Sequence, residues 1–245
     1  MSGFCSLVTL TGADQTVEPE QLLEISKEFP EVEWAILFSQ SKSGVSRYPS
    51  LDWVEKLVSL ALETKINLSA HLCGKWVDLA IKGSCIFFQD ERWNSVFGRV
   101  QFNLSKNRLS SVINNDSEIF KVCSELKQHC ILGGNFSSLN IDAQKFLSNN
   151  LHPLFDASGG NGVLTKVWPT SWVFEGHPLF CGYAGGLGPE NIRDEFIKIK
   201  EKSQGNFWID METKIRNSQD KFDLDKCRAV LGIVRESNGQ SNILN

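Results

Sequence analysis

A cluster of glycines near residue 185 has the composition of a turn that can bind an anion. Gly185, Gly186 and Gly188 follow a short apolar segment, and Pro189 stands where helices commonly begin. Glycines allow positive φ angles, and the N–H groups at a helix start are unpaired and lie at the positive end of the helix dipole. A phosphate suits such a turn, and Asn191 completes the segment, although many glycine-rich turns bind nothing.

The next apolar segment places two carboxylates close to this turn. Residues 206–212 have the composition of a strand, and Asp210 and Glu212 lie near its end, followed by Thr213. In an eight-stranded α/β barrel, the last two strands form a phosphate-binding corner at their carboxyl ends. A glycine-rich strand end followed by a polar one therefore favours a phosphate site over an ordinary turn.

Other polar residues also stand at the ends of predicted strands, where the active site of such a barrel lies. The full set is Thr9, Thr11, Arg47, His71, Cys73, Gln101, Asn103, Asn135, Asp156, Asp210 and Glu212. His71 and Cys73 share one face of the third strand with Asn67 and Ser69, so these four side chains point to the same side of the sheet. Such a polar face is unusual for packing alone, although a single buried histidine is more often structural.

Asp156 and Arg47 each have a functional and a structural interpretation. Asp156 ends an apolar strand and precedes a glycine-rich stretch at residues 157–162. A carboxyl group backed by hydrophobic residues can act as a general acid, or it can accept hydrogen bonds from the backbone of the turn that follows. Asp210 faces the same choice. The planar guanidinium of Arg47 suits a carboxylate or a phosphate, although a loop arginine is more often solvated.

The overall composition is that of a globular protein. The chain has 245 residues, 41% of them hydrophobic, and a formal net charge of −4, with no basic run that would predict a nucleic-acid partner. Seven cysteines with no CxxC pair favour free thiols in a reducing compartment over disulfides or a zinc site, and we expect no metal. Without a membrane-length apolar run or a signal peptide, we expect a cytoplasmic monomer or homodimer with no membrane partner.

Strand and helix patterns alternate eight times along the chain. The strand patterns cover residues 7–10, 33–39, 66–74, 99–105, 129–133, 153–156, 180–185 and 206–212. Eight such units predict a single closed (β/α)8 barrel, a TIM barrel that spans residues 1–245. A doubly wound open sheet is the alternative. It would normally carry a glycine fingerprint in its first strand-to-helix turn, where this chain has only Gly12.

Several of these segments resemble the motifs of one family, phosphoribosylanthranilate isomerase, the barrel enzyme of tryptophan biosynthesis. Residues 184–191 resemble the seventh-strand phosphate motif of the family, and residues 210–213 lie where its eighth-strand phosphate loop lies, without the serine and glycine of that loop. Residues 155–162 resemble the motif of its catalytic acid, which is Asp156 here. Residues 38–50 resemble the second loop, whose arginine, Arg47, meets the anthranilate carboxylate. Val100-Gln101 resembles the start of the fourth-strand motif.

The resemblance implies an Amadori rearrangement of a small phosphorylated sugar without a cofactor. A general acid protonates the ribose ring oxygen, and a base removes the proton from the neighbouring carbon. The family's base is a cysteine in the first strand, and Thr11 occupies its place here. We therefore hypothesise Asp156 as the acid and His71 or Cys73 as the base, since imidazole and thiol groups both titrate near neutrality.

The remaining strand-end residues are expected to bind the substrate, and two questions stay open. Arg47, Gln101, Asn103, Asp210 and Glu212 are the candidate substrate-binding residues. The alternative to an isomerase is a barrel that has diverged in its catalysis, which binds a phosphorylated metabolite or acts on another sugar phosphate. The insertion from Trp168 to His177 either covers the mouth of the barrel as a lid or packs on its rim.

Overall fold

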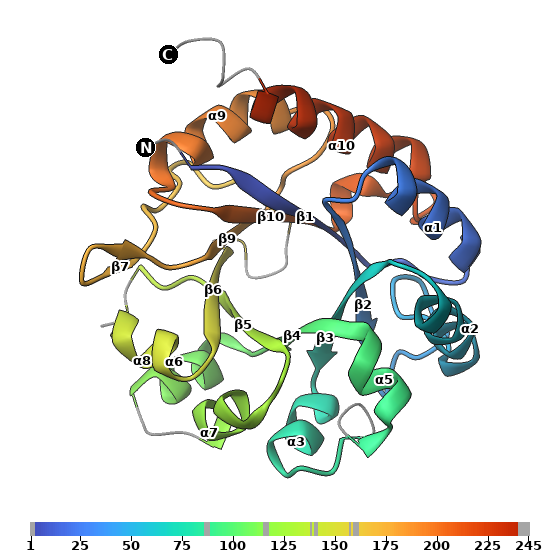
Figure 1. Ribbon diagram of the computed structural model, residues 1–245, viewed down its shortest axis with the longest axis horizontal. Helices are drawn as coiled ribbons and strands as arrows, with labels where there is room; N and C mark the ends of the chain where they lie inside the picture. Colours follow the sequence, from blue (N-terminus) through green and yellow to red (C-terminus); the bar gives the residue numbers. More distant parts are fainter. Residues whose placement is uncertain are drawn as a thin grey trace.

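The computed structural model describes residues 3–85, 89–114, 118–137, 139, 142–156, 158 and 162–239. Eight parallel strands form a closed barrel in the order β1-β10-β9-β6-β5-β4-β3-β2, and the pairing of β1 with β10 closes it (Figure 1). These strands are β1 (Cys5–Thr11), β2 (Val32–Phe38), β3 (Asn67–Cys73), β4 (Phe97–Asn103), β5 (His129–Gly134), β6 (Leu151–Asp156), β9 (Cys181–Ala184) and β10 (Phe207–Met211). The predicted barrel and each of its eight strands are confirmed.

The position of the strands explains why their sequences are nearly continuous apolar runs. All seven residues of β2 are buried, because one face of the strand points into the barrel and the other packs under helices. Glu33 is the one charged residue of β2, and it is buried like the rest of the strand, at only 2% exposed. Its partner inside the barrel is Arg99 of β4, which lies 3.2 Å away and is 6% exposed.

Helices surround the barrel in Figure 1 and cover the outer faces of the strands. They are α1 (Pro19–Glu28), α2 (Leu51–Glu63), α3 (Lys75–Ile81), α5 (Glu91–Val96), α6 (Lys106–Asn114), α7 (Glu118–Glu125), α8 (Ala143–Ser148), α9 (Ile192–Lys202) and α10 (Leu224–Gly239). The start of α2 shows how the sequence sets a boundary, because the Ser50 side chain accepts a hydrogen bond from the Trp53 N–H. No helix in the described ranges is both long and apolar enough to cross a membrane.

The structure corrects the predicted helices in three places. The helix α6 was not predicted, because its serine and asparagine residues are weak helix formers and only Leu109, Val112 and Ile113 are buried. The helix α5 overlaps residues 85–93, whose sequence favours an irregular connection or an extra strand over a helix. The helix α9 begins at Ile192, three residues after the predicted start at Pro189, since the intervening residues form a turn.

The connection between β6 and β9 contains no helix within residues 162–180 and instead includes the short hairpin of β7 (Val173–Phe174) and β8 (His177–Pro178). Trp172 packs edge-on against Phe155 at 5.4 Å between ring centroids, and Trp168 donates a 2.7 Å hydrogen bond to Glu195. Phe155 alternates along β6 with Leu154 and Asp156, which face the interior, so its ring faces outward. The predicted insertion therefore packs on the outside of the barrel, where Figure 1 also places β7.

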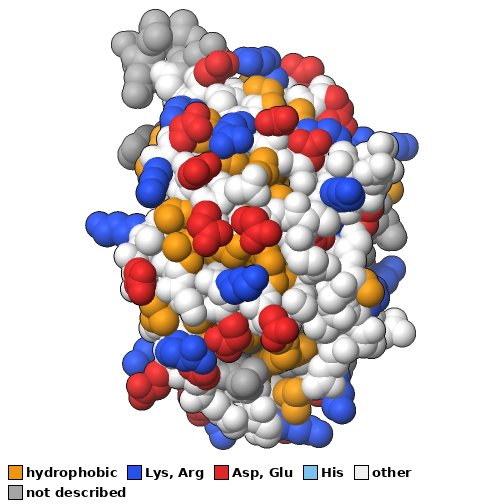
Figure 2. Space-filling view, turned by 90° about the vertical axis from the view of Figure 1, so that its right-hand side faces the viewer, with side chains coloured by type: hydrophobic (Ala, Val, Ile, Leu, Met, Phe, Trp, Pro, Cys, Tyr) orange, Lys and Arg blue, Asp and Glu red, His pale blue; other side chains and the backbone are white. Residues whose placement is uncertain are grey.

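The outer surface carries mixed charges. Figure 2, which views the molecule from the side of α1 and α2, shows acidic and basic side chains interspersed with small hydrophobic areas. All seven cysteines are free thiols, and only Cys73 is not fully buried.

Candidate functional site

A cavity of about 630 Å³ opens at the carboxyl ends of the barrel strands and is called the mouth cavity below. All predicted site residues line it except Thr9, Arg47, Gly188 and Asn191. Those that line it are Thr11, His71, Cys73, Gln101, Asn103, Asn135, Asp156, Gly185, Gly186, Asp210, Glu212 and Thr213. Residues from both halves of the chain thus meet at the end of the barrel where (β/α)8 enzymes carry their active sites.

Thr11 and Asp210 form the shortest contact between predicted site residues. The Thr11 Oγ1 hydroxyl donates a 2.6 Å hydrogen bond to Asp210 Oδ1, and both residues are buried. Thr11 is at the end of β1 and Asp210 is near the end of β10, so the pair exists because these two strands close the barrel. The threonine that replaces the expected cysteine is therefore joined directly to a carboxyl group.

Among the carboxyl groups that line the cavity, Asp210 has the pKa that lies furthest from its ordinary value. Burial raises the pKa of Asp210 to about 7, the nearby charges of Glu212 and Glu33 add to the rise, and the Thr11 hydrogen bond opposes it. A carboxyl group with a pKa near 7 is present in both its protonated and ionised forms at neutral pH. Asp210 therefore has the property that a general base or acid requires at that pH.

Asp156 lines the mouth cavity two strands away from Asp210, with β9 between β6 and β10. Its Oδ1 atom accepts hydrogen bonds from the Ser158 N–H at 2.9 Å and the Ser158 hydroxyl at 2.7 Å. Gly185, with a φ of +108°, passes close by, and a Cβ atom at that position would lie 3.2 Å from Asp156 Oδ1. Asp156 thus caps the turn that follows β6, as one of its two interpretations predicts, and its carboxyl group still lines the cavity.

His71 and Cys73 line the cavity but lack the properties of a base. Burial and the positive charge of Arg99 lower the pKa of His71 to about 3, so the imidazole stays neutral and binds protons weakly. Burial raises the pKa of Cys73, although Asn103 donates a 3.2 Å hydrogen bond to its sulfur. A thiol with a raised pKa is a poor source of thiolate. The hypothesis that either residue is the base is therefore at odds with its surroundings.

Arg47 lies beside the mouth cavity and is held by carboxylates of the chain itself. Its guanidinium contacts Glu212 at 2.8 Å and Asp220 at 2.8 Å, and donates to the Thr213 hydroxyl at 3.2 Å. Its backbone has a φ of +71° and its N–H donates to Asp14 Oδ2 at 2.7 Å. These contacts fix the loop after β2 to the loop after β10 and occupy the donors that the sequence predicts for a substrate carboxylate.

The glycines of the predicted phosphate turn are required by contacts within the chain. A Cβ atom on Gly186 would lie 2.4 Å from the Leu164 backbone N, and one on Gly188 would lie 2.4 Å from the Lys214 Cβ. Asn191 braces this turn, because its side chain accepts from the Gly188 N–H at 2.9 Å and donates to the Gly186 carbonyl at 2.8 Å. The close approach at Gly186 and Gly188 is thus made by neighbouring segments, and Gly185 and Gly186 form the cavity wall.

Two lysines and a tyrosine are among the residues of the mouth cavity that were not predicted from the sequence. Lys106 and Lys214 bring positive charge to the cavity wall, and Tyr48 lines the same cavity. Lys214 forms a 2.8 Å ion pair with Glu190, and both side chains are about half exposed. Lys106 stands three residues past the end of β4, so a basic residue just beyond a predicted strand end was the available signal. Tyr48 follows Arg47 directly in the sequence.

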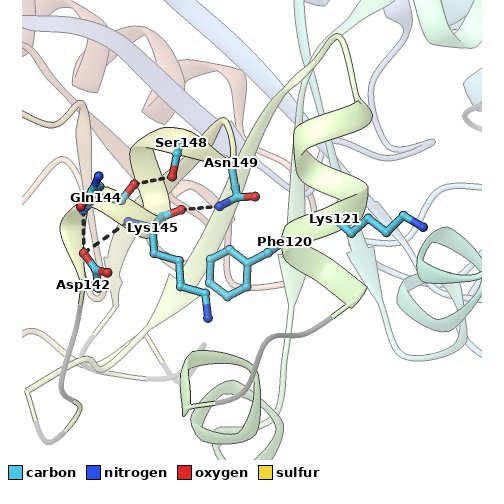
Figure 3. Close-up of a pocket in the computed structure, with 7 residues that line it drawn as sticks. All are labelled: Phe120, Lys121, Asp142, Gln144, Lys145, Ser148 and Asn149. Carbon is cyan, nitrogen blue, oxygen red and sulfur yellow. Dashed lines mark hydrogen bonds between the residues drawn. The ribbon is translucent and has the colours of Figure 1, made fainter.

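A second cavity, of about 440 Å³, lies on the outer surface between α7 and α8 (Figure 3). Its polar groups serve the local structure. The Asp142 carboxylate accepts from the Gln144 and Lys145 N–H groups at the start of α8, and the Lys145 ammonium lies 4.4 Å from the centre of the Phe120 ring. The mouth cavity is therefore the better candidate. Nowhere in the described ranges do three histidine, cysteine, aspartate or glutamate side chains gather as a metal site requires.

Comparison with known proteins gives matches in structure only. No family model matches the sequence, and no curated protein is similar to it. TrpF from Jonesia denitrificans has a TM-score of 0.59 at 13% identity, with 94% of this chain and 97% of that chain covered. Phosphoribosyl anthranilate isomerase from Thermus thermophilus has a TM-score of 0.55 at 11% identity, with 94% and 98% covered. A truncated 3-deoxy-D-arabino-heptulosonate 7-phosphate synthase from Thermotoga maritima has a TM-score of 0.54 at 11% identity, with 99% and 88% covered. The chain therefore has the (β/α)8 barrel fold of these enzymes.

Proposed function

We propose that the chain is a sugar-phosphate isomerase of the phosphoribosylanthranilate isomerase type. Two carboxyl groups, Asp156 and Asp210, line the same cavity at the active-site end of the barrel. Both are in register with Ala184 of β9, which separates their strands. Two strand spacings correspond to roughly 10 Å between their backbones, which leaves room for a small ligand between the side chains.

In this proposal Asp156 is the acid and Asp210 is the base. Asp156 donates a proton to the ribose ring oxygen as the bond between that oxygen and C1 breaks, and the nitrogen lone pair forms a C1=N double bond. Asp210 then takes the proton from C2, and the electrons of that C–H bond form the enolamine and neutralise the nitrogen. The enolamine tautomerises to the ketone. An acid and a base of this kind contribute typically 10²–10⁴-fold each to such reactions.

The observation that carries the proposal is the Thr11–Asp210 hydrogen bond. It joins the residue in the place of the family's cysteine to a carboxyl group whose pKa is about 7. The replacement of cysteine by threonine then moves the base from β1 to the neighbouring strand β10. The Thr11 hydroxyl holds the Asp210 carboxylate in one orientation, as the third group of a catalytic triad orients its base.

The phosphate end of the substrate is proposed to lie against Gly185, Thr213 and Lys214. Lys214 lines the cavity and its ion pair with Glu190 is about half exposed, so solvent screens the pair and an incoming phosphate can compete for the ammonium group. The names of two of the structurally similar enzymes given above contain a phosphorylated sugar, which supports a ligand of this class.

One observation favours a second candidate, an isomerase for another sugar phosphate. Arg47 is engaged by Glu212 and Asp220 and does not line the cavity. A substrate with an anthranilate carboxylate would have to displace these partners, whereas a substrate without that carboxylate would not. The two candidates share Asp156, Asp210 and the phosphate end, and differ only in the substituent on the sugar.

The test is turnover of N-(5′-phosphoribosyl)anthranilate, followed by the loss of its fluorescence, alongside a panel of other aminosugar phosphates. Turnover that falls by at least 10²-fold in the Asp156→Asn variant supports the proposal. Turnover of another member of the panel supports the second candidate. A folded protein that is stabilised by these compounds but converts none of them is a binding protein, and the proposal is then wrong.

A further inference from the structure

The Glu33–Arg99 ion pair lies directly beneath the mouth cavity. Arg99 comes two residues before Gln101 on β4, and Gln101 lines the cavity. Because alternate residues of a strand share a face, Arg99 points into the barrel one layer deeper. On β10 Trp208 stands two residues before Asp210 in the same way, and the Arg99 guanidinium lies 4.2 Å from the centre of the Trp208 ring.

The hydrogen bonds of this deeper layer resemble those of the layer that lines the mouth cavity. Thr9, two residues before Thr11 on β1, donates a 2.8 Å hydrogen bond to Glu33 Oε2, as Thr11 donates to Asp210. Glu33 Oε2 also accepts from Arg99 Nη1 at 3.2 Å. Glu33 and Arg99 are thus held in fixed positions inside the barrel, with side chains 3% and 8% exposed.

The charge of Arg99 is only partly neutralised by Glu33. Its Nε and Nη2 atoms are buried and have no hydrogen-bond partner among the described residues. Buried donors without partners cost free energy, so a chain that keeps them is expected to gain something in return. An arginine side chain remains protonated in proteins, and its field acts over a longer distance inside a barrel than in water.

The two charges of this pair act on the pKa of Asp210 in opposite directions. Arg99 acts to lower the pKa of Asp210, and Glu33 acts to raise it, as does Glu212 at the end of β10. Arg99 also lowers the pKa of His71, the cavity residue on β3. The neighbours of Asp210 on β1 and β9 are uncharged, and Asp156 on β6 lines the same cavity two strands away.

We propose that Arg99 and Glu33 are positioning residues that set the charge of Asp210 from the layer below the cavity, Arg99 favouring the carboxylate and Glu33 opposing it. This inference rests on the proposed function for its purpose, since a base must be partly ionised at working pH. Its physical content is independent of turnover. Neither residue touches the cavity, and both act through space on a group that does.

The experiment is a pH titration of the Asp210 carboxyl by carbon-13 NMR in the free protein, with the signal assigned by its absence in Asp210→Asn. Arg99→Met is expected to raise the titration midpoint by about one pH unit and Glu33→Gln to lower it. Arg99→Lys keeps the charge and should leave the midpoint within a few tenths of a unit. Glu236→Gln, which breaks the exposed Arg193–Glu236 pair, is the control and should not shift it.

Removal of one partner of a buried pair can prevent folding, so the double variant Glu33→Gln/Arg99→Met is included. Its midpoint should lie above that of Glu33→Gln alone, because only Arg99 differs between the two. Shifts of the same sign in both single variants, or no shift beyond the control, would overturn the inference. The predicted shifts in a protein without turnover would support the inference and contradict the proposed function. Turnover without the shifts would support the proposed function and overturn the inference.

Discussion

The Thr11 hydroxyl donates a 2.6 Å hydrogen bond to the Asp210 carboxyl across the two strands that close the barrel. The two residues are 199 positions apart in the chain, and both are buried at the base of the mouth cavity. Thr11 is the residue to which the sequence resemblance assigns the place of the family's catalytic cysteine. We expect this pair and the side chains around it to influence both the stability and the activity of the protein.

Substitution of Asp210 by asparagine should stabilise the protein at high pH. The folded-state pKa of Asp210 is about 7, above the ordinary value of 3.8, so the folded state binds the proton more tightly than the unfolded state. The contribution of the group is full below about pH 4 and is lost as pH rises through 7. Asp210→Asn cannot ionise, and its advantage over the wild type should grow from pH 4 to pH 8, by up to roughly 4 kcal/mol.

Urea unfolding of both proteins between pH 4 and pH 8 measures this difference. Asp194→Asn, at an exposed position in the first turn of α9, is the control, and its effect should be nearly constant over the same range. A difference between wild type and Asp210→Asn that does not change with pH would show that Asp210 is ionised throughout.

Replacement of Thr11 by valine should remove the hydrogen bond to Asp210 while keeping the shape of the side chain. A hydrogen bond to a charged group contributes about 1.5–3 kcal/mol and one to a neutral group about 1 kcal/mol, so the loss should be larger at pH 8 than at pH 5. Thr11→Ser keeps the hydroxyl and should retain most of the stability. A loss in the serine variant with none in the valine variant would mean that the methyl group, and not the hydrogen bond, is what matters.

Arg216 should be the most sensitive position in the loops around the cavity. Its side chain is 1% exposed, pairs with the buried Asp14 at 2.6 Å, and donates to the Gly12 carbonyl at 2.6 Å. Arg216→Met leaves Asp14 buried without its partner, and the expected loss is about 3–5 kcal/mol in the free energy of unfolding. Arg193→Met breaks an exposed pair with Glu236 and should cost less than about 1 kcal/mol. Similar losses in chemical denaturation would contradict this role for Arg216.

The segment that contains Trp168 and Trp172 should behave as part of the outer wall and not as a lid. Trp172 contacts Phe136, Phe146 and Phe155 at ring-centroid distances of 5.0, 5.1 and 5.4 Å. Trypsin cleavage at the exposed Lys166 should therefore proceed at the same rate with and without a bound sugar phosphate. Strong protection by ligand would mean that the segment moves over the mouth.

The strands, and the strand ends that line the mouth cavity, could be predicted because their signals are local. Apolar runs ending in polar residues mark each strand, and the carboxyl ends of parallel strands must meet at one edge. The helix α6 is not predicted, because Ser110, Ser111 and Asn114 are weak helix formers and interrupt its helical pattern. Residues 162–180 form no helix, which agrees with their weak helical signals, and aromatic contacts with distant residues hold this segment in place.

The chemistry of the site depends on contacts that the sequence does not encode locally. Asp210 was expected as a substrate-binding residue, but its pairing with Thr11 arises only when the barrel closes. Arg47 has the residue type of an anion-binding group, yet Glu212 and Asp220 occupy it. The burial of His71, which makes it a weak base, follows from the packing of the whole interior. The roles of these residues in catalysis remain predictions.

The central claim is that Asp210 is the base, and the most direct measurement is kcat/KM for N-(5′-phosphoribosyl)anthranilate between pH 5 and pH 9. In the wild type it should rise with pH through a midpoint near 7, as the Asp210 carboxyl ionises. In Asp210→Asn it should fall by 10²–10⁴-fold and lose that rise. An Asp210→Asn variant that turns over at nearly the wild-type rate, with the same dependence on pH, would contradict the account.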